Sequence, residues 1–362
     1  MQDLAETAYR LLVINPGSTS TKIAVFEDER VVVSQTLRHK PEELAQFKNV
    51  EDQYGFRKHL VLEALKTQGI RVDSLHAVVG RGGLLKPVPG GVFRIGPKMI
   101  EELRASAYGR HASNLAALIA YEIAQECGIP SFVVDPVVVD ELEPVARLSG
   151  LPEITRRSAF HALNQRAVAR RAAAELGLKY NESHLIVAHL GGGITVGAHR
   201  HGRVIDVNNG IDGEGPFTPE RAGALPVIDL IGLCFSGQFT EAALRKKIML
   251  QGGLMAYLGT TDATEVEAMI RAGNQEAALF YEAMAYQVAK EIGAAATVLK
   301  GEIDAVVLTG GLAYSSMLVG WIKERVAFLG KILVYPGENE MEALAGGVLR
   351  VLRGQEQAMD YT

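Results

Sequence analysis

Three short glycine turns follow segments of apolar, largely β-branched residues, and these turns are the first feature of the chain that could do chemistry. They contain Gly17; Gly191, Gly192 and Gly193; and Gly310 and Gly311. Because glycine has no Cβ, the backbone N–H groups of such a turn can approach a phosphate group closely. One glycine turn is most often only a turn, but three of them predict a nucleotide site. The GxxxxGK[ST], HRD and DFG motifs are missing, so a P-loop or protein-kinase fold is not expected.

The first of these turns is also rich in polar side chains. The segment NPGSTSTK, from Asn15 to Lys22 and including Ser20, places hydroxyls and a lysine on one short turn. Such groups contact phosphate oxygens and hydrated Mg²⁺. An ordinary Ser/Thr-rich hairpin would have the same composition, so both interpretations stay open.

Two charged residues occupy positions typical of ligand contacts. Asp135 ends an apolar segment, and carboxylates at the carboxyl ends of central strands lie where α/β sheets bind ligands. A simple Asp-Pro turn is the alternative. Arg221 lies in a loop restrained by Pro216, Pro219 and Gly223, which suits bidentate binding of a carboxylate or phosphate. The alternative is a surface ion pair.

Four further residues carry weaker signals. His189 ends an apolar segment directly before a glycine turn, and His161 follows a turn of mixed charge, although a lone histidine is usually structural. Asp262 precedes an acidic segment and is a plausible helix N-cap. Glu340 stands where a final helix begins and could be a cap or a ligand.

The elements that must position these residues form a repeated pattern. Strands are predicted at 11–15, 21–26, 31–37, 76–79, 131–134, 185–189, 194–198, 204–207 and 305–309, and helices at 56–68, 113–127 and 341–352. One constant shift along the chain places Asn15 on His189 and Gly17 on Gly191. This repeat predicts a duplicated domain rather than a solenoid. Residues 354–362 are expected to form a frayed polar tail.

Composition excludes several classes of protein. The net charge of −5 argues against nucleic acid as the main partner, because phosphate-backbone binding needs a basic face. The two cysteines fit no metal or disulfide pattern, and no apolar run is long enough to span a membrane. Residues 1–10 do not resemble a secretory leader. A cytoplasmic protein with two domains is therefore expected.

Taken together, the motifs resemble the acetate kinase family, and within it the butyrate kinase and branched-chain fatty-acid kinase branch. The matching segments are VINPGSTSTK (13–22), VVGRGG (78–83), VVDPVVVDEL (133–142), RRSAFHALNQ (156–165), AHLGGGITVG (188–197), PFTPERAGALP (216–226), VVLTGGLAYS (306–315) and PGENEMEALAGG (336–347). They span nearly the whole chain in the family's order.

The resemblance implies a duplicated ribonuclease-H-like α/β fold with central mixed sheets, of the actin, sugar-kinase and Hsp70 superfamily. Residues 1–136 with 341–362 would form the N-terminal actin-like domain. Residues 137–340 would form the C-terminal domain, with the nucleotide-binding cleft. ATP or ADP and Mg²⁺ are the implied cofactors, and a homodimer or larger homo-oligomer is the implied assembly.

The resemblance also implies roles for individual residues. Mg²⁺ would be surrounded by Asn15, Asp135 and Glu340. The transferring phosphoryl group would lie near Ser20 and Lys22, and its transition state would be stabilised by His161 and Arg221. The nucleotide would be held by His189, Gly191, Gly192, Gly193, Asp262, Gly310 and Gly311.

One position departs from the family. Acetate kinases place a substrate arginine two residues before a Val-His-Gly-Gly sequence, where this chain has Val78. Arg81 stands where the family's histidine would be, and we expect it to replace that arginine and to act with Asp135 among the catalytic residues. The implied reaction is butanoate + ATP ⇌ butanoyl phosphate + ADP. It needs no strong general base, because a carboxylate is already ionised at neutral pH.

Several alternatives remain at this point. Isobutyrate or another branched acid, acetate and propionate are possible substrates, because one methylene changes discrimination by only about 1–3 kcal/mol. A sugar kinase of the same superfamily would need an aspartate base, which Asp135 could supply. A nucleotide-driven conformational switch would need a peptide-binding domain or polymer contacts, and a repressor of the same superfamily would need an N-terminal helix-turn-helix.

Overall fold

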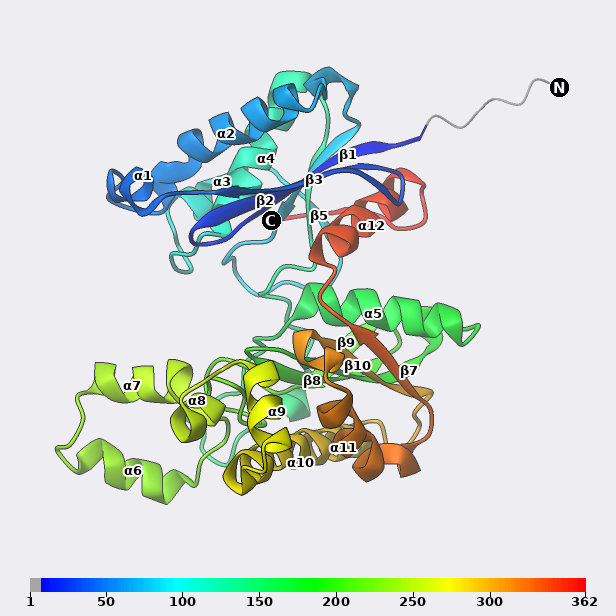
Figure 1. The fold of residues 1–362 in the computed structure, drawn as a ribbon. Coiled ribbons are helices and arrows are strands. Elements are labelled where there is room, and N and C mark those ends of the chain that lie inside the picture. The colour runs from blue at the N-terminus through cyan, green and yellow to red at the C-terminus, as the bar shows by residue number, and fades with distance from the viewer. Residues whose placement is uncertain (1–7) are drawn as a thin grey trace. The chain divides into compact units, whose positions relative to one another are not determined.

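The computed structural model describes residues 8–362, and these residues form two compact units (Figure 1). Of the described residues, unit 1 contains 8–139 and Asn339–Thr362, and unit 2 contains Asp140–Glu338. The prediction about a secretory leader concerns residues 1–10, of which 1–7 lie outside the described residues. No helix in the described part of the chain is long and apolar enough to cross a membrane.

Unit 1 is built on a seven-stranded mixed sheet with the order β12-β5-β6-β4-β1-β2-β3. Its strands are β1 (Arg10–Pro16), β2 (Ser20–Glu27), β3 (Arg30–Arg38), β4 (Ala77–Arg81), β5 (Val92–Arg94), β6 (Ser131–Val134) and β12 (Met359–Asp360). Strands β1, β4 and β6 are parallel neighbours, while β2 and β3 continue antiparallel from β1. The parallel strands are almost completely buried, as expected for strands covered on both faces.

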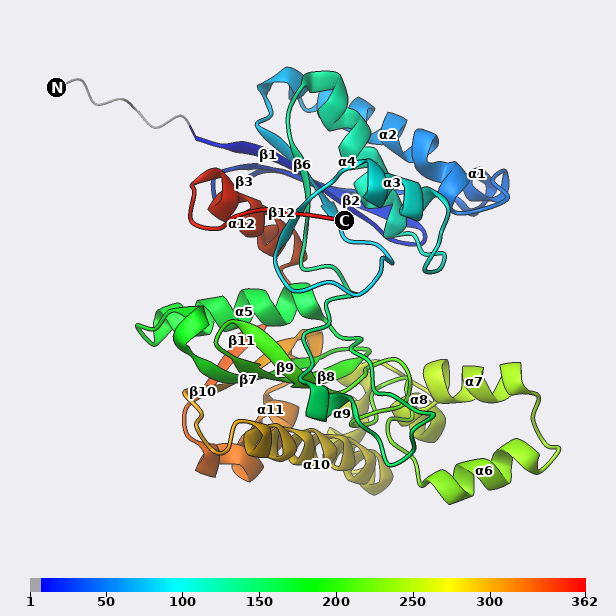
Figure 2. The ribbon, with the colours of Figure 1, turned by 180° about the vertical axis from the view of Figure 1, so that it is seen from behind.

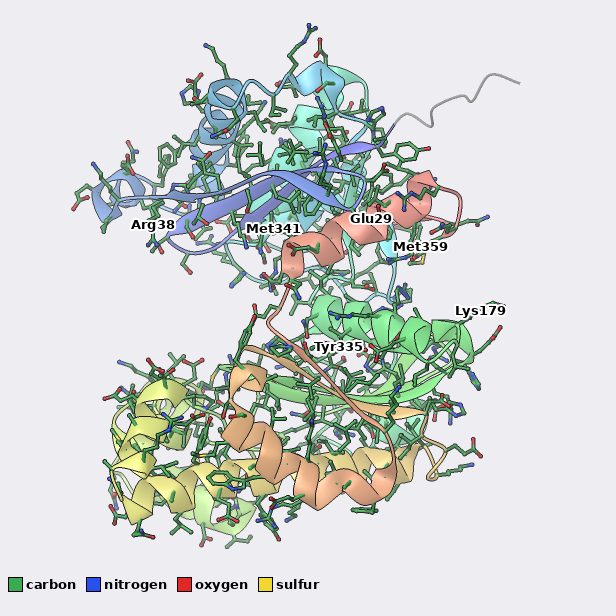
Figure 3. All side chains as sticks on the ribbon, turned by 45° about the vertical axis from the view of Figure 1, so that its right-hand side comes forward. Glu29, Arg38, Lys179, Tyr335, Met341 and Met359 are labelled. Atoms are coloured by element: carbon green, nitrogen blue, oxygen red, sulfur yellow. The ribbon has the colours of Figure 1, made fainter. Side chains whose placement is uncertain are left out.

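Helices cover both faces of this sheet. The helices of unit 1 are α1 (Pro41–Ala45), which has no buried residue, α2 (Tyr54–Thr67), α3 (Pro97–Arg104), α4 (Asn114–Cys127) and α12 (Glu340–Leu352). Figures 1 and 2 show α12 on one face and α2, α3 and α4 on the other. Gly80 allows α4 to pack directly on β4, because a Cβ at this position would lie 2.8 Å from the backbone of Ala116. Glu29, in the turn between β2 and β3, lies near α12 (Figure 3) and forms an ion pair with Arg353, the residue after α12.

The prediction of a frayed tail at 354–362 is wrong. Strand β12 pairs in parallel with β5, and Tyr361 is only 8% exposed. The Tyr361 hydroxyl donates a hydrogen bond to the Glu102 carboxylate, and the side chain of Met359, labelled in Figure 3, packs against the unit 1 core. A prediction based on the polar average of the segment overlooked these two side chains, which bury enough apolar surface to dock it.

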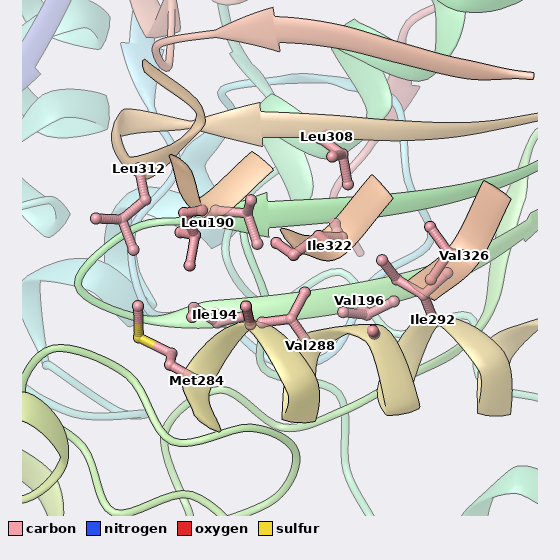
Figure 4. Close-up of a cluster of buried hydrophobic side chains, with 14 of the residues drawn as sticks. Leu190, Ile194, Val196, Met284, Val288, Ile292, Leu308, Leu312, Ile322 and Val326 are labelled. Carbon is pink, nitrogen blue, oxygen red and sulfur yellow. The ribbon is translucent and has the colours of Figure 1, made fainter. Parts of the chain in front are cut away.

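Unit 2 is built on a five-stranded mixed sheet with the order β11-β10-β7-β8-β9. Its strands are β7 (His184–Leu190), β8 (Ile194–Arg200), β9 (Arg203–Val207), β10 (Ala305–Gly310) and β11 (Ile332–Pro336). Its helices are α5 (Ala162–Glu175), α6 (Val227–Phe235), α7 (Glu241–Leu250), α8 (Gly253–Leu258), α9 (Ala263–Arg271), α10 (Gln275–Val298) and α11 (Ser316–Val326). Figure 4 shows the core in which α10 and α11 pack on β7, β8 and β10 through side chains such as Val196, Val288 and Ile322.

The predicted internal repeat is present in both sheets. In each unit three consecutive antiparallel strands, β1-β2-β3 or β7-β8-β9, continue a parallel sheet. The shift that places Asn15 on His189 also places both ends of β1 on the ends of β7, and the start of β2 on the start of β8. The predicted fold class, a duplicated α/β fold with mixed sheets, is confirmed.

Candidate active site

In unit 1 three predicted site residues follow one another along the carboxyl edge of the parallel strands. Strand β1 pairs with β4 so that Ile14 lies beside Gly80, and β4 pairs with β6 so that Arg81 lies beside Val134. Asn15, Arg81 and Asp135 therefore occupy neighbouring positions on strands about 4.8 Å apart. This is the edge where α/β sheets bind ligands.

Glu340 joins this edge from the first turn of α12. Asn15 Nδ2 donates to Glu340 Oε2 at 2.7 Å, and Arg81 Nη1 lies 2.7 Å from Oε1 and 2.9 Å from Oε2 of the same carboxylate. The Arg81 and Glu340 side chains are 38% and 22% exposed, so solvent can reach the ion pair. The structure therefore brings together Asn15, Arg81 and Glu340, which lie far apart in the sequence. We call Asn15, Arg81, Asp135 and Glu340 the unit 1 cluster.

Asp135 is held in an unusual backbone conformation. Its φ of +38° is in the left-handed region, which costs a non-glycine residue about 1 kcal/mol or more. The residue is 4% exposed, and its Oδ1 accepts a hydrogen bond from the Gly91 N–H at 2.7 Å. Its own N–H donates to the Gly91 carbonyl. Because the backbone is fixed in this way, the carboxylate has a defined position after β6.

Ser20 and Lys22 lie on β2, beside β1. Asn15 is directly opposite Lys22 in the antiparallel pair, so these two side chains share one face of the sheet. Ser20 belongs to the same face because it lies two residues before Lys22. Lys22 is exposed and Ser20 is half-buried, so both can reach a ligand at this face.

Sequence reasoning missed Arg57, which supports the turn between β1 and β2. Arg57 is 1% exposed, and its guanidinium donates to the carbonyls of Gly17, Ser18 and Ser20 at 2.8, 2.9 and 3.0 Å. Burial lowers the pKa of Arg57 to about 10. A signal was available, because Arg57 lies four and eight residues before the buried Val61 and Leu65, on the apolar face of α2.

In unit 2 the two predicted histidines lie against each other. The rings of His161 and His189 are stacked, with centroids 3.7 Å apart and planes inclined by 8°. His189, 1% exposed, ends β7, and its Nδ1 lies 2.7 Å from Asn164 Oδ1. Because an amide oxygen can only accept, His189 Nδ1 carries a proton. His189 Nε2 is buried, lies 3.7 Å from Glu338 Oε1 and forms no hydrogen bond with the described residues.

Arg221 and His161 meet at the glycine turn. A Cβ on Gly193 would lie 2.5 Å from Arg221 Nη1 and 3.3 Å from His161 Cε1, so both side chains flank this residue. The Thr218 hydroxyl donates to the Gly192 carbonyl at 2.6 Å and accepts the Arg221 N–H at 3.0 Å, which fastens the arginine loop to the turn. We call His161, His189, Arg221 and residues 191–193 the unit 2 cluster.

The remaining predicted nucleotide contacts have structural roles of their own. Gly310 has φ +90°, and a Cβ there would lie 2.3 Å from the Leu190 carbonyl oxygen, so only glycine fits. Gly311 meets nothing within 4 Å of its Cβ position and leaves open space. Asp262 is the N-cap of α9, accepting the Thr264 N–H at 2.8 Å. The capping interpretation of Asp262 is confirmed, while its contact with a nucleotide stays a prediction.

Each unit thus has a mixed sheet with predicted site residues at the ends of its strands. The structure is similar to that of acetate kinase from Porphyromonas gingivalis, with a TM-score of 0.78 and 21% identity over 95% of this chain and 100% of that chain. It is also similar to propionate kinase from Francisella tularensis subsp. tularensis SCHU S4, with a TM-score of 0.71 and 18% identity over 94% of this chain and 98% of that chain. Acetate kinase from Entamoeba histolytica gives a TM-score of 0.72 and 18% identity over 93% of this chain and 98% of that chain. At this identity the likeness establishes the fold.

The Acetokinase family model matches residues 151–341, more than half of the 362 residues. The chain belongs to the acetokinase family, a family of ATP-dependent carboxylate kinases. The predicted class of enzyme is confirmed at this level.

Proposed function

We propose that the protein phosphorylates a short-chain fatty acid: butanoate + ATP ⇌ butanoyl phosphate + ADP. The observation that carries the proposal is the meeting of Arg221 and His161 at Gly193, in a chain of the acetokinase family. The preference for butanoate rests on the resemblance of the motifs to the butyrate branch. Isobutyrate, propionate and acetate are the competing acids.

The unit 2 cluster suits a reaction in which the enzyme must stabilise negative charge rather than remove a proton. The carboxylate nucleophile is already ionised, so the enzyme must position it and stabilise the charge that develops on the phosphoryl oxygens. Arg221 offers a rigid fork of N–H donors, and His161 offers a ring N–H. We propose that both groups bind the transferring phosphoryl group, and that Ser20 and Lys22 of unit 1 contact it as well.

The nucleotide would be held by the glycine turns. In this proposal His189 and residues 191–193 contact its phosphates, and Gly310, Gly311 and Asp262 contact the rest of the molecule. The open space at Gly311 and the exposed backbone of Gly192 support this assignment.

The unit 1 cluster has donors that fit Mg²⁺. Asn15, Asp135 and Glu340 offer amide and carboxylate oxygens, the ligands that Mg²⁺ prefers. The Asn15 and Glu340 side chains are within hydrogen-bond distance of each other, which supports binding of both to one ion. When bound, Mg²⁺ would neutralise negative charge on the nucleotide phosphates. Arg81 now balances the Glu340 charge, and we propose that it turns to the substrate carboxylate during the reaction.

The test is a panel of initial-rate measurements with ATP, in which hydroxylamine traps the acyl phosphate. The panel contains acetate, propionate, butanoate, isobutyrate, valerate and glucose. Butanoate or isobutyrate should exceed acetate in kcat/KM by about tenfold or more, because each extra buried CH₂ contributes about 0.8 kcal/mol. Higher kcat/KM for acetate would place the protein in the acetate branch, and phosphorylation of glucose would refute the carboxylate assignment.

The predicted assembly, a homodimer or larger homo-oligomer, and the cytoplasmic location stay predictions. One observation bears on the assembly: α6 has no buried residue, and its Val227, Ile228 and Phe235 side chains are 66%, 79% and 87% exposed. An apolar face of this kind usually packs against another surface. Sedimentation velocity of the wild type and of Ile228→Glu would show whether a second copy covers α6, since the variant should then dissociate.

A further inference from the structure

A chain of buried polar side chains runs from the interior of unit 2 to His161. Along β8, Val196 and Ala198 belong to the core with α10, while Thr195 and His199 alternate with them and contact residues of α5. Gln165 on α5, Thr195 and His199 are each 0% exposed. Uncharged polar groups buried this deeply must satisfy one another, so the direction of each hydrogen bond can be worked out.

The orientation of the Gln165 amide is fixed by a backbone carbonyl. Gln165 Nε2 lies 2.9 Å from both the Thr195 carbonyl oxygen and Thr195 Oγ1. A carbonyl oxygen only accepts, so the Gln165 atom beside it must be the NH₂ group rather than the amide oxygen. Gln165 therefore donates to Thr195 Oγ1. Its Oε1, 3.1 Å from His199 Nε2, must then accept from that ring nitrogen.

The protonation of His199 supports the same direction of the hydrogen bond between its Nε2 and Gln165 Oε1. Burial, with the charges of Arg166 and Arg170, lowers the pKa of His199 to about 3, so the ring is neutral and carries one proton. That proton is on Nε2, facing Gln165. Nδ1, 2.9 Å from the Tyr180 hydroxyl, must therefore accept a hydrogen bond from Tyr180.

At the His161 end of this series of hydrogen bonds, the directions of the bonds decide which ring nitrogen of His161 carries the proton. Thr195 Oγ1 accepts from Gln165, and its hydrogen is directed to His161 Nδ1, 3.0 Å away. A neutral imidazole that accepts at Nδ1 carries its proton on Nε2. Protonating Nδ1 would set two hydrogens against each other and leave the buried hydroxyl hydrogen without its acceptor, which is unfavourable.

We infer that Thr195 and Gln165 are positioning residues that hold His161 as the neutral tautomer protonated on Nε2. In this state His161 carries its N–H donor on Nε2 and does not add a second cation beside Arg221. This inference rests on the proposed function for its catalytic consequence. Its structural content, the tautomer, does not depend on that function.

Thr195→Val removes the hydroxyl at nearly constant shape, and Thr195→Ser is the matched control that keeps it. Long-range ¹H–¹⁵N spectra of the ¹⁵N-histidine-labelled full chain, assigned with His161→Gln, report the tautomer and titration of His161. The wild type and Thr195→Ser should show the Nε2–H form, and Thr195→Val should gain the Nδ1–H form and titrate at a shifted pH. A wild-type Nδ1–H form, or an unchanged tautomer in Thr195→Val, would overturn the inference.

Turnover supplies the second readout. With the preferred acid, kcat of Thr195→Val should fall by about tenfold or more, with a displaced pH profile, while Thr195→Ser stays near the wild type. A purely structural role would lower the melting temperature but leave the spectra and the pH profile unchanged. If the wild type phosphorylates no carboxylate, the proposed function fails, while the spectra still decide the tautomer.

Discussion

Replacing Gly193 with alanine would test whether Arg221 must stand where the structure places it. The new Cβ would lie 2.5 Å from Arg221 Nη1 and 3.2 Å from its Cζ. Because an ordinary contact needs about 3.5 Å, the guanidinium must move by about 1 Å. The Arg221 backbone is held by the Thr218 hydroxyl, so the flexible side chain should yield rather than the fold.

A displacement of this size in a positioned catalytic group costs about 10²-fold in rate, so kcat of Gly193→Ala should fall to about one hundredth. The matched control is Gly293→Ala on α10, whose Cβ would meet nothing within 4 Å. Hydroxylamine trapping gives the rates, and thermal unfolding shows whether the variants are folded. The reasoning fails if Gly193→Ala melts normally and turns over at a rate near the wild type.

Three further outcomes are expected. Arg221→Ala should lower kcat by about 10²-fold or more at an unchanged melting temperature. Arg221→Lys should restore little of the activity, because a point charge cannot replace a bidentate fork of donors. A near-normal kcat of Arg221→Ala would show that Arg221 only forms its ion pair with Glu220. Arg57→Leu should lower the free energy of unfolding by about 2–4 kcal/mol, since it removes charged donors from three carbonyls that are partly open to solvent. Denaturant titration measures this free energy, and a loss under about 1 kcal/mol would contradict the role of Arg57 in supporting the first turn. The melting temperature should fall as the pH drops below about 6.5, because His199 is protonated at its ordinary pKa in the unfolded chain but only near pH 3 in the folded protein. In His199→Gln the melting temperature should fall less steeply with pH. An equally steep fall would show that other groups control acid unfolding.

The repeat and the strands that carry the site were predictable because they are local patterns. Runs of apolar residues that end at Gly17, Gly191 and Gly310 mark buried strands and their turns, and a constant offset between the two halves of the chain marks a duplication. The tail at 354–362 was predicted wrongly. Its docking depends on Met359 and Tyr361 reaching a core assembled from distant segments.

The sequence by itself determined the fold class, the acetokinase family and most of the candidate residues, since these follow from residue types, spacing and motif order. Only the tertiary structure decided which residues touch: Glu340 with Asn15 and Arg81, Arg57 with the first turn, and Thr195 with His161. Hydrogen bonds between residues tens or hundreds of positions apart depend on strand register and helix packing. Neither is set by the local spacing from which sequence patterns are read.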